Sequence, residues 1–181
     1  FPISLQDRGR KALRRIEGLE EAIALESVFC QGTVIYQKNG KSRSIPRKNS
    51  ILTIDRQRLV AILLQQLLAN ADPDRVKIQF ECTCTHIERV AKTVTLQPAI
   101  GEEFTVNYDV LIGADGARSQ VREDLAQDAG WNCEQTYISD AYKSVFLTRI
   151  DRSQGLELAP DKIHTGNLDR NTRMIMVPQP G

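Results

Sequence analysis

The sequence predicts a mixed α/β protein, because strand-like and helix-like segments alternate along the chain. An apolar run at 51–54 leads directly into a helical pattern of leucines and isoleucines. An Asn-Gly pair lies between β-prone runs and predicts a hairpin over residues 29–46. A continuous apolar run at 110–112 ends in a Gly-Ala-Asp-Gly turn at 113–116, which is typical of a buried strand that opens into a ligand site.

Composition excludes several classes of protein. The chain has 181 residues, of which 41% are hydrophobic and 26% charged, and 24 Lys and Arg against 23 Asp and Glu leave a net charge of +1. We therefore expect neither a nucleic-acid partner nor attraction to an anionic membrane. No apolar run approaches the roughly 20 residues that a membrane span needs, and the four cysteines form no C-x-x-C pair. Reduced thiols and a cytoplasmic location are expected.

The first 28 residues predict two short helices. Ser4 and Asp7 resemble a capping box, which places a helix start near Gln6. Gly18 is expected to break the segment. Arginines and a lysine crowd the first turns, against the preference of the helix dipole. They form either a solvated face or a site that holds an anion such as a phosphate.

Later elements follow from alternation and from helix-start signals. Asp55 is a predicted N-cap for a helix that ends at 70–73. Further strands are expected at 76–80, 93–96, 104–108 and 110–112, and a short helix at 118–125. The last 50 residues read as strands separated by polar loops, at 142–150, 162–165 and 173–177.

The segment 109–122 carries the clearest chemical signal. Gly113 and Gly116 allow a tight turn and close approach of a ligand, and Asp115 supplies a carboxylate at the end of a predicted strand. Ser119 to Arg122 would present free amides and a cation. The segment therefore suits a phosphate or a ribityl chain, although the same residues can form a turn with no ligand.

The motif D-G-x-x-S-x-V-R at 115–122 resembles that of the flavoprotein aromatic hydroxylases, which are FAD-dependent monooxygenases of the p-hydroxybenzoate hydroxylase fold. Residues 4–13, residues 51–59 and residues 137–142 resemble the kynurenine 3-monooxygenase branch, in the same order and at similar spacing. The resemblance implies part of a three-layer FAD-binding domain at 1–28 and 51–130. It also implies part of an inserted and following β-rich substrate domain at 29–50 and 131–181.

The resemblance leaves two cofactor motifs unmatched. The G-x-G-x-x-G fingerprint and the later Gly-Asp motif are absent from this sequence. The chain opens at Phe1 without a methionine and stops just behind a strand-like run. We therefore expect an internal piece of a longer protein, truncated at both ends.

The resemblance implies FAD and NAD(P)H as cofactors and a small aromatic compound as substrate. The residues expected to contact FAD are Ser4, Arg56, Cys84, Asp115 and Gly116. Arg122 is a candidate for the phosphates of NAD(P)H. In the hairpin, the positions that match the family's substrate-binding Arg and Tyr are Thr33 and Arg47. No residue of this chain is assigned a catalytic or a metal-binding role.

The expected function is hydroxylation of an aromatic substrate with NAD(P)H and O2 by the longer protein. Two alternatives stay open: a non-catalytic binding or structural module, and another flavoprotein of the same fold, such as a halogenase or a reductase. The chain alone is expected to be inactive, to bind FAD weakly or not at all, and to form a homodimer or protect its sheet edge in another way.

Overall fold

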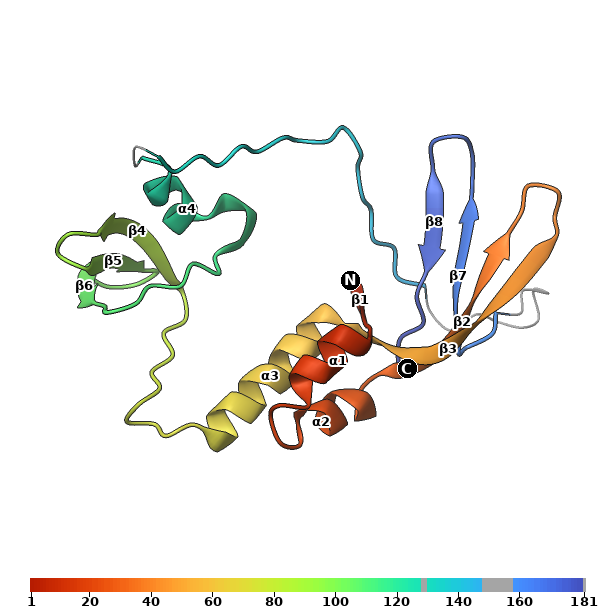
Figure 1. Cartoon of the computed structure of the whole chain (residues 1–181), viewed down its shortest axis with the longest axis horizontal. Helices are drawn as coiled ribbons and strands as arrows, with labels where there is room; N and C mark the ends of the chain where they lie inside the picture. Colours follow the sequence, from red (N-terminus) through yellow and green to blue (C-terminus); the bar gives the residue numbers. More distant parts are fainter. Residues whose placement is uncertain (128–129, 148–157, 181) are drawn as a thin grey trace. The chain divides into compact units, whose positions relative to one another are not determined.

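The structure, a computed structural model, describes residues 1–127, 130–147 and 158–180 (Figure 1). The chain divides into two compact units, one formed by Phe1–Pro73 with Tyr142–Gly181 and the other by Asp74–Ala141. These units are defined by the contacts that residues make within each of them. The expected division into an FAD-binding part and a substrate-binding part is defined by function, and it stays a prediction.

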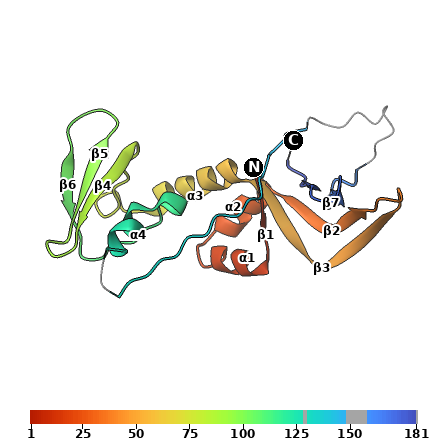
Figure 2. The ribbon, with the colours of Figure 1, turned by 90° about the horizontal axis from the view of Figure 1, so that it is seen from above.

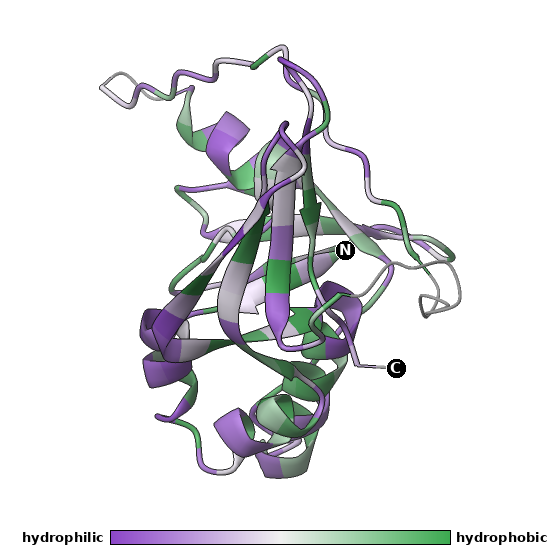
Figure 3. Ribbon diagram, turned by 90° about the vertical axis from the view of Figure 1, so that its right-hand side faces the viewer, coloured by the Kyte–Doolittle hydropathy of each residue, from purple (hydrophilic) through white to green (hydrophobic). Residues whose placement is uncertain are grey.

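The first unit is built on a five-stranded sheet with the order β1-β3-β2-β7-β8. Figure 2 shows its two long strands, β2 and β3. Its strands are β1 (Pro2–Leu5), β2 (Val28–Tyr36), β3 (Ser42–Asp55), β7 (Lys162–Asn167) and β8 (Arg173–Met176). Neighbouring strands are antiparallel, except that β2 and β7 run parallel. Figure 3 shows both hydrophobic and hydrophilic positions on these strands. Along β3 they are separated, because the first eight residues are exposed and Ile51, Leu52, Thr53 and Ile54 are buried.

The predicted hairpin is confirmed. Strands β2 and β3 pair from Tyr36 opposite Ser42, and Gly40 in the connecting turn has a φ of 78°, which favours glycine. The expected separate strand at 51–54 is wrong in one respect, because these residues form the end of the 14-residue strand β3. That end is held between β1 and the start of β2, so pairing on both sides extends the strand.

Three helices accompany this sheet: α1 (Asp7–Leu13), α2 (Leu19–Leu25) and α3 (Arg56–Asn70). The core between them consists of Leu19, Ile23, Ile54 and Ile62. The break at Gly18 is confirmed, since this residue precedes α2 with a φ of 72°.

Side-chain capping was predicted correctly for one helix and wrongly for another. The Asp55 carboxylate accepts hydrogen bonds from the amides of Gln57 and Arg58, at 2.8 and 3.3 Å, and so caps α3. The capping box at Ser4 does not form, because Ser4 lies within β1, opposite Thr53, and Gln6 holds the N-cap position of α1 without a side-chain bond. Pairing of β1 with β3 thus overrides the local capping preference.

Two arginines at the end of α1, Arg10 and the C-cap residue Arg14, bind the same acidic partner. Arg10 and Arg14 both donate to the carboxylate of Glu20 in α2, with Nε to oxygen distances of 2.7 and 2.5 Å. Glu20 is only 8% exposed. Neither a solvated face nor an anion site describes these two arginines, because the fold supplies an acidic partner from the next helix.

The second unit contains a three-stranded antiparallel meander of β4 (Cys82–Glu88), β5 (Thr93–Pro98) and β6 (Phe104–Asn107). The predicted strands at 93–96 and 104–108 are confirmed. The short helix is also confirmed as α4 (Gln120–Leu125), preceded by a 3-10 turn at Gly116–Arg118.

Three strand predictions are wrong. Residues 76–80 and 110–112 form no strand, and Val110 and Ile112 are 79% and 82% exposed. Among the described residues no strand pairs with either segment, so their apolar pattern has no sheet to complete. Residues 142–147 also form no strand, and 148–150 lie outside the described residues. The strands expected at 162–165 and 173–177 are confirmed as β7 and β8.

A membrane span is not found in the structure: none of the helices in the described ranges is both long and apolar enough to cross a bilayer.

Candidate functional site

The turn that contains Asp115 is organised by the carboxylate of that residue. Ser119 Oγ donates to Asp115 Oδ1 at 2.5 Å, and the amide of Val121 donates to Oδ2 at 3.2 Å. The hydrogen bond from Ser119 is the main cause that lowers the pKa of Asp115 below its ordinary value. The carboxylate is therefore ionised at neutral pH and bridges the turn to the first residues of α4.

Ser119 connects this turn to the helix. Its Oγ accepts a hydrogen bond from the amide of Arg122 at 3.0 Å, and the residue is 7% exposed. It is thus both the N-cap of α4 and the donor to Asp115. Ser119 was not among the predicted site residues, although a serine followed by a helical pattern is a recognisable N-cap signal.

Arg122 faces back into the same turn. Its Nη2 donates to the carbonyl of Ala117 at 2.6 Å, and Nη1 donates to that of Gly116 at 3.4 Å. Gln135 contributes two longer contacts, one with Arg122 Nη2 and one with the Ala117 carbonyl, each at 3.4 Å. Arg122 therefore stabilises the turn, and its expected role toward NAD(P)H stays a prediction.

The two glycines of the turn meet different requirements. A Cβ on Gly113 would lie 2.7 Å from Cβ of Val121, so glycine permits the chain to pack against α4. Gly116 has a φ of 79°, and a Cβ there would have no heavy atom of the described residues within 4 Å. The backbone at Gly116 is therefore open to the approach of a ligand, whereas Gly113 serves packing.

Cys84 lies beside this turn in the second unit. The thiol is partly buried in β4, and burial raises its pKa. The negative charges of Asp115 and Asp124 raise the pKa further. The structure therefore brings together four predicted site residues, namely Cys84, Asp115, Gly116 and Arg122.

Ser4 and Arg56 occupy the first unit. Ser4 is an exposed residue of β1, and Arg56 is the first residue of α3. The two elements meet where the amide of Arg56 donates to the carbonyl of Phe1 at 3.1 Å. The Arg56 guanidinium carbon also lies 5.6 Å from the centre of the Phe1 ring. Ser4 and Arg56 therefore lie at one end of the sheet, where the guanidinium group of Arg56 is exposed.

Thr33 and Arg47 lie on the paired strands β2 and β3. Thr33 is opposite Ile45, and Arg47 follows two residues later on β3. Arg47 is exposed and has no hydrogen bond or ion pair to any described residue. The hairpin thus presents an exposed cation at Arg47, and the expected role of Thr33 and Arg47 toward a substrate stays a prediction.

A buried polar pair in the same sheet was missed from the sequence. Tyr36 Oη and His164 Nδ1 are 2.9 Å apart, and His164 Nε2 lies 2.9 Å from the carbonyl of Ala159. A carbonyl only accepts, so Nε2 carries the proton and Nδ1 accepts from the tyrosine hydroxyl. His164 is 3% exposed and joins β2 to β7. No sequence signal pairs residues this far apart.

Sequence comparison relates the chain to known enzymes. No protein-family model matches it. Kynurenine 3-monooxygenase from Salinispora arenicola is 30% identical over 150 residues, which cover 80% of this chain and 32% of that protein. This chain is a homologue of part of the FAD-dependent aromatic hydroxylases, in the kynurenine 3-monooxygenase-like branch.

Other relatives agree with this assignment to the kynurenine 3-monooxygenase-like branch. The enzyme of that name from Drosophila melanogaster is 25% identical over 178 residues, covering 96% of this chain and 37% of that protein. The one from Sus scrofa is 27% identical over 165 residues, covering 90% and 34%. The chain therefore spans about a third of the length of the curated hydroxylases that it matches.

A solved structure shares the fold. The crystal structure of p-nitrophenol 4-monooxygenase PnpA from Pseudomonas putida DLL-E4 aligns with a TM-score of 0.58, over 67% of this chain and 32% of that one. The two sequences are 18% identical in this alignment, so the comparison concerns the fold alone. It confirms the predicted mixed α/β flavin monooxygenase fold.

Proposed function

We propose that this chain contributes cofactor-contacting and substrate-contacting residues to an FAD-dependent monooxygenase, which hydroxylates a small aromatic substrate with NAD(P)H and O2. The observation that carries the proposal is the Asp115 turn, where an ionised, exposed carboxylate lies next to an open glycine backbone. The homology to kynurenine 3-monooxygenases supports the choice of flavin chemistry over other uses of such a turn.

The turn fits a polyhydroxylated chain such as the ribityl group of FAD. A carboxylate has about four lone-pair positions, and Asp115 accepts from Ser119 Oγ and the Val121 amide, with the amides of Gln120 and of Asp115 itself also directed at it. Because the side chain is exposed, a ligand hydroxyl group can reach the carboxylate and compete for these positions. The space around Gly116 allows such a ligand to approach the backbone.

The other proposed contacts rest on charge for Arg56 and on the family resemblance for the remaining residues. Arg56 would bind the FAD pyrophosphate, because an exposed guanidinium pairs well with phosphate oxygens. Cys84 would contact the adenosine half through its backbone, and Ser4 would lie near the flavin. Thr33 and Arg47 would bind the substrate. FAD, when bound, supplies the redox chemistry, in which NAD(P)H is the reductant and O2 the source of the added oxygen.

The test uses the complete product of the gene that encodes this chain. We expect it to purify with flavin absorbance and to oxidise NAD(P)H faster when a suitable aromatic acid is present. Asp115→Ala should reduce FAD affinity several-fold, because an exposed charged hydrogen-bonding group is lost. Arg47→Ala is the matched control, since it should leave FAD affinity unchanged and weaken the effect of the aromatic acid. A colourless gene product that gains no absorbance with added FAD would refute the proposal.

A further inference from the structure

Strand β3 contains a large bulge next to the first helix. Gly32 of β2 lies opposite Pro46, whereas Cys30 lies opposite Ile51. One residue of β2 therefore faces the four residues 47–50 of β3. Bulges of this kind change the direction of side chains and occur frequently beside binding sites.

The bulge and helix α1 enclose a surface hollow of about 410 Å³. Asn49 Nδ2 donates to the Asp7 carboxylate at 2.7 Å and joins the bulge to the helix. The polar side chains around the hollow come from both elements and are Gln6, Asp7, Arg8, Arg47, Lys48 and Asn49. We call this feature the basic hollow.

The three cations of the basic hollow have no partners among the described residues. The side chains of Arg8, Arg47 and Lys48 form no hydrogen bond or ion pair with a described residue. Nearby arginines differ from them, since Arg10 and Arg14 bind Glu20. Among the described residues that line the hollow, Asp7 supplies the one carboxylate, which accepts a hydrogen bond from the neutral Asn49 amide and offsets one of the three positive charges.

Three cations and one carboxylate leave an excess of positive charge around this concavity, which creates a local positive potential that attracts an anion. Guanidinium groups suit planar or tetrahedral oxyanions, because they can donate two parallel hydrogen bonds. The side-chain amide of Gln6 adds a further donor at the rim of the hollow. Elsewhere in the protein the overall charge is nearly balanced, at +1, so this potential is a local property.

We propose that the basic hollow is an oxyanion-binding site, in which Arg8 and Lys48 act together with Arg47. The ligand group is a carboxylate, as in an aromatic acid, or a phosphate, as in a nucleotide. This deepens the proposed function, on which it rests for Arg47 as a substrate contact, by adding Lys48 and by assigning Arg8, one of the basic residues of the first helical turns, to an anion site. It also predicts that the substrate or cofactor portion bound here is anionic.

The experiment titrates the 181-residue chain, labelled with ¹⁵N, with sodium benzoate in one series and with inorganic phosphate in another. Ionic strength is held constant with sodium chloride. We expect saturable changes in the amide signals of residues 6–8 and 47–49. Arg8→Gln, Arg47→Gln and Lys48→Gln should each weaken binding by about threefold to tenfold, as expected for the loss of a partly exposed charged contact.

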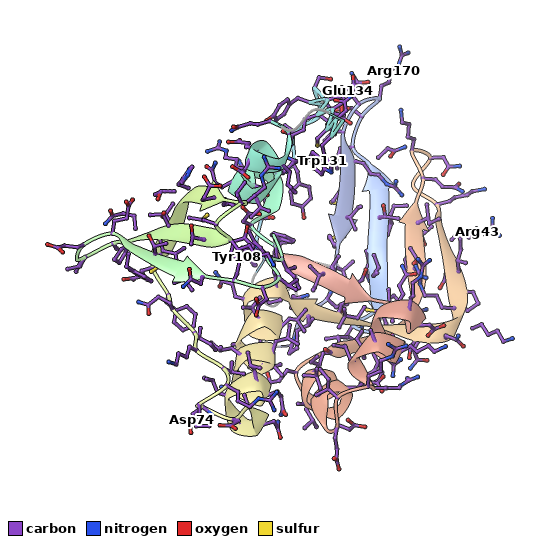
Figure 4. All side chains as sticks on the ribbon, turned by 60° about the vertical axis from the view of Figure 1, so that its left-hand side comes forward. Arg43, Asp74, Tyr108, Trp131, Glu134 and Arg170 are labelled. Carbon is purple, nitrogen blue, oxygen red and sulfur yellow. The ribbon has the colours of Figure 1, made fainter. Side chains whose placement is uncertain are left out.

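Arg43→Gln is the matched control. Arg43 is an exposed arginine of the same strand β3, lies outside the basic hollow and projects from the hairpin (Figure 4). Its replacement should leave binding unchanged. Spectra of the free variants, compared with that of the unaltered chain, show whether each variant keeps its fold, and all four substitutions are at exposed positions.

The two series identify the source of the oxyanion. Stronger binding of benzoate indicates an aromatic carboxylate, and stronger binding of phosphate indicates a nucleotide or another phosphate ester. Absence of saturable change in both series overturns the inference, and so does equal weakening by Arg43→Gln and Arg47→Gln. The proposed function fails separately, if the complete gene product does not bind FAD.

Discussion

At the scale of single residues, Ser119 holds the Asp115 turn together. Its hydroxyl donates to Asp115 and accepts from the amide of Arg122. We expect Ser119→Ala to raise the pKa of Asp115 toward its ordinary value of about 3.9, because the largest cause of the lowered pKa is lost. It should also destabilise α4 by about 1 kcal/mol through loss of the N-cap.

Carboxyl NMR titration measures the pKa, and Ser119→Thr, which keeps the hydroxyl, is the control. Because the folded pKa of Asp115 is lowered, its contribution to stability is present above about pH 4 and is lost as the pH falls through the folded value. An unchanged Asp115 pKa in Ser119→Ala would contradict this account.

Gly113 offers a second test at the residue scale. A methyl group there would lie 2.7 Å from Val121 Cβ, so the turn and α4 would have to move apart. We expect Gly113→Ala to destabilise the second unit by about 1 to 3 kcal/mol, the usual cost of overpacking. Gly9→Ala in α1 is the contrasting variant, since its Cβ would meet Leu5 at an ordinary 3.6 Å. That change should be neutral or stabilising, and chemical denaturation measures both variants.

At the scale of elements, the contact between α1 and α2 depends on Glu20. The hydrogen bond from Arg14 is the main cause that lowers its pKa, and Arg10 adds to the effect. We expect Glu20→Ala to lower the denaturation midpoint at neutral pH. The stabilisation by Glu20 is present above its unfolded pKa of about 4.3 and is lost at lower pH.

The variant and the unaltered chain should therefore converge in stability as the solution is acidified below about pH 4. The control is Glu21→Ala, which removes an exposed neighbour that has no ion pair among the described residues. Thermal unfolding across this pH range measures the difference, and a constant difference down to pH 2 would count against the pairing.

At the scale of the whole molecule, two apolar segments, 76–80 and 110–112, pair with no strand in the described part of the chain. Val110 and Ile112 are largely exposed, and Phe80 in the other segment is 63% exposed. Surfaces of this kind favour association. We therefore expect the 181-residue chain to bind FAD much more weakly than the complete gene product, and to self-associate as a dimer. Flavin fluorescence and light scattering measure these two properties, and stoichiometric FAD binding by a monomer would contradict both expectations.

Sequence alone was sufficient where the determining interactions are local. The Asn39-Gly40 turn, the break at Gly18 and the Asp55 cap each depend on backbone angles or hydrogen bonds within a few residues. The D-G-x-x-S-x-V-R motif likewise contains its own bonding partners, since Asp115, Ser119 and Arg122 contact one another or their shared turn. Most of the Asp115 site could therefore be predicted before the structure.

Only the tertiary structure decided the features that join distant parts of the chain. The bulge at 47–50 brings Arg47 and Lys48 to the same hollow as Arg8. No spacing in the sequence indicates that these three residues lie close together. The same holds for the Tyr36–His164 bond and for β1, whose pairing with β3 places Ser4 in a strand. The apolar segments at 76–80 and 110–112 show the converse. A strand pattern becomes a strand only when a neighbour satisfies its backbone hydrogen bonds, and that neighbour is a property of the fold.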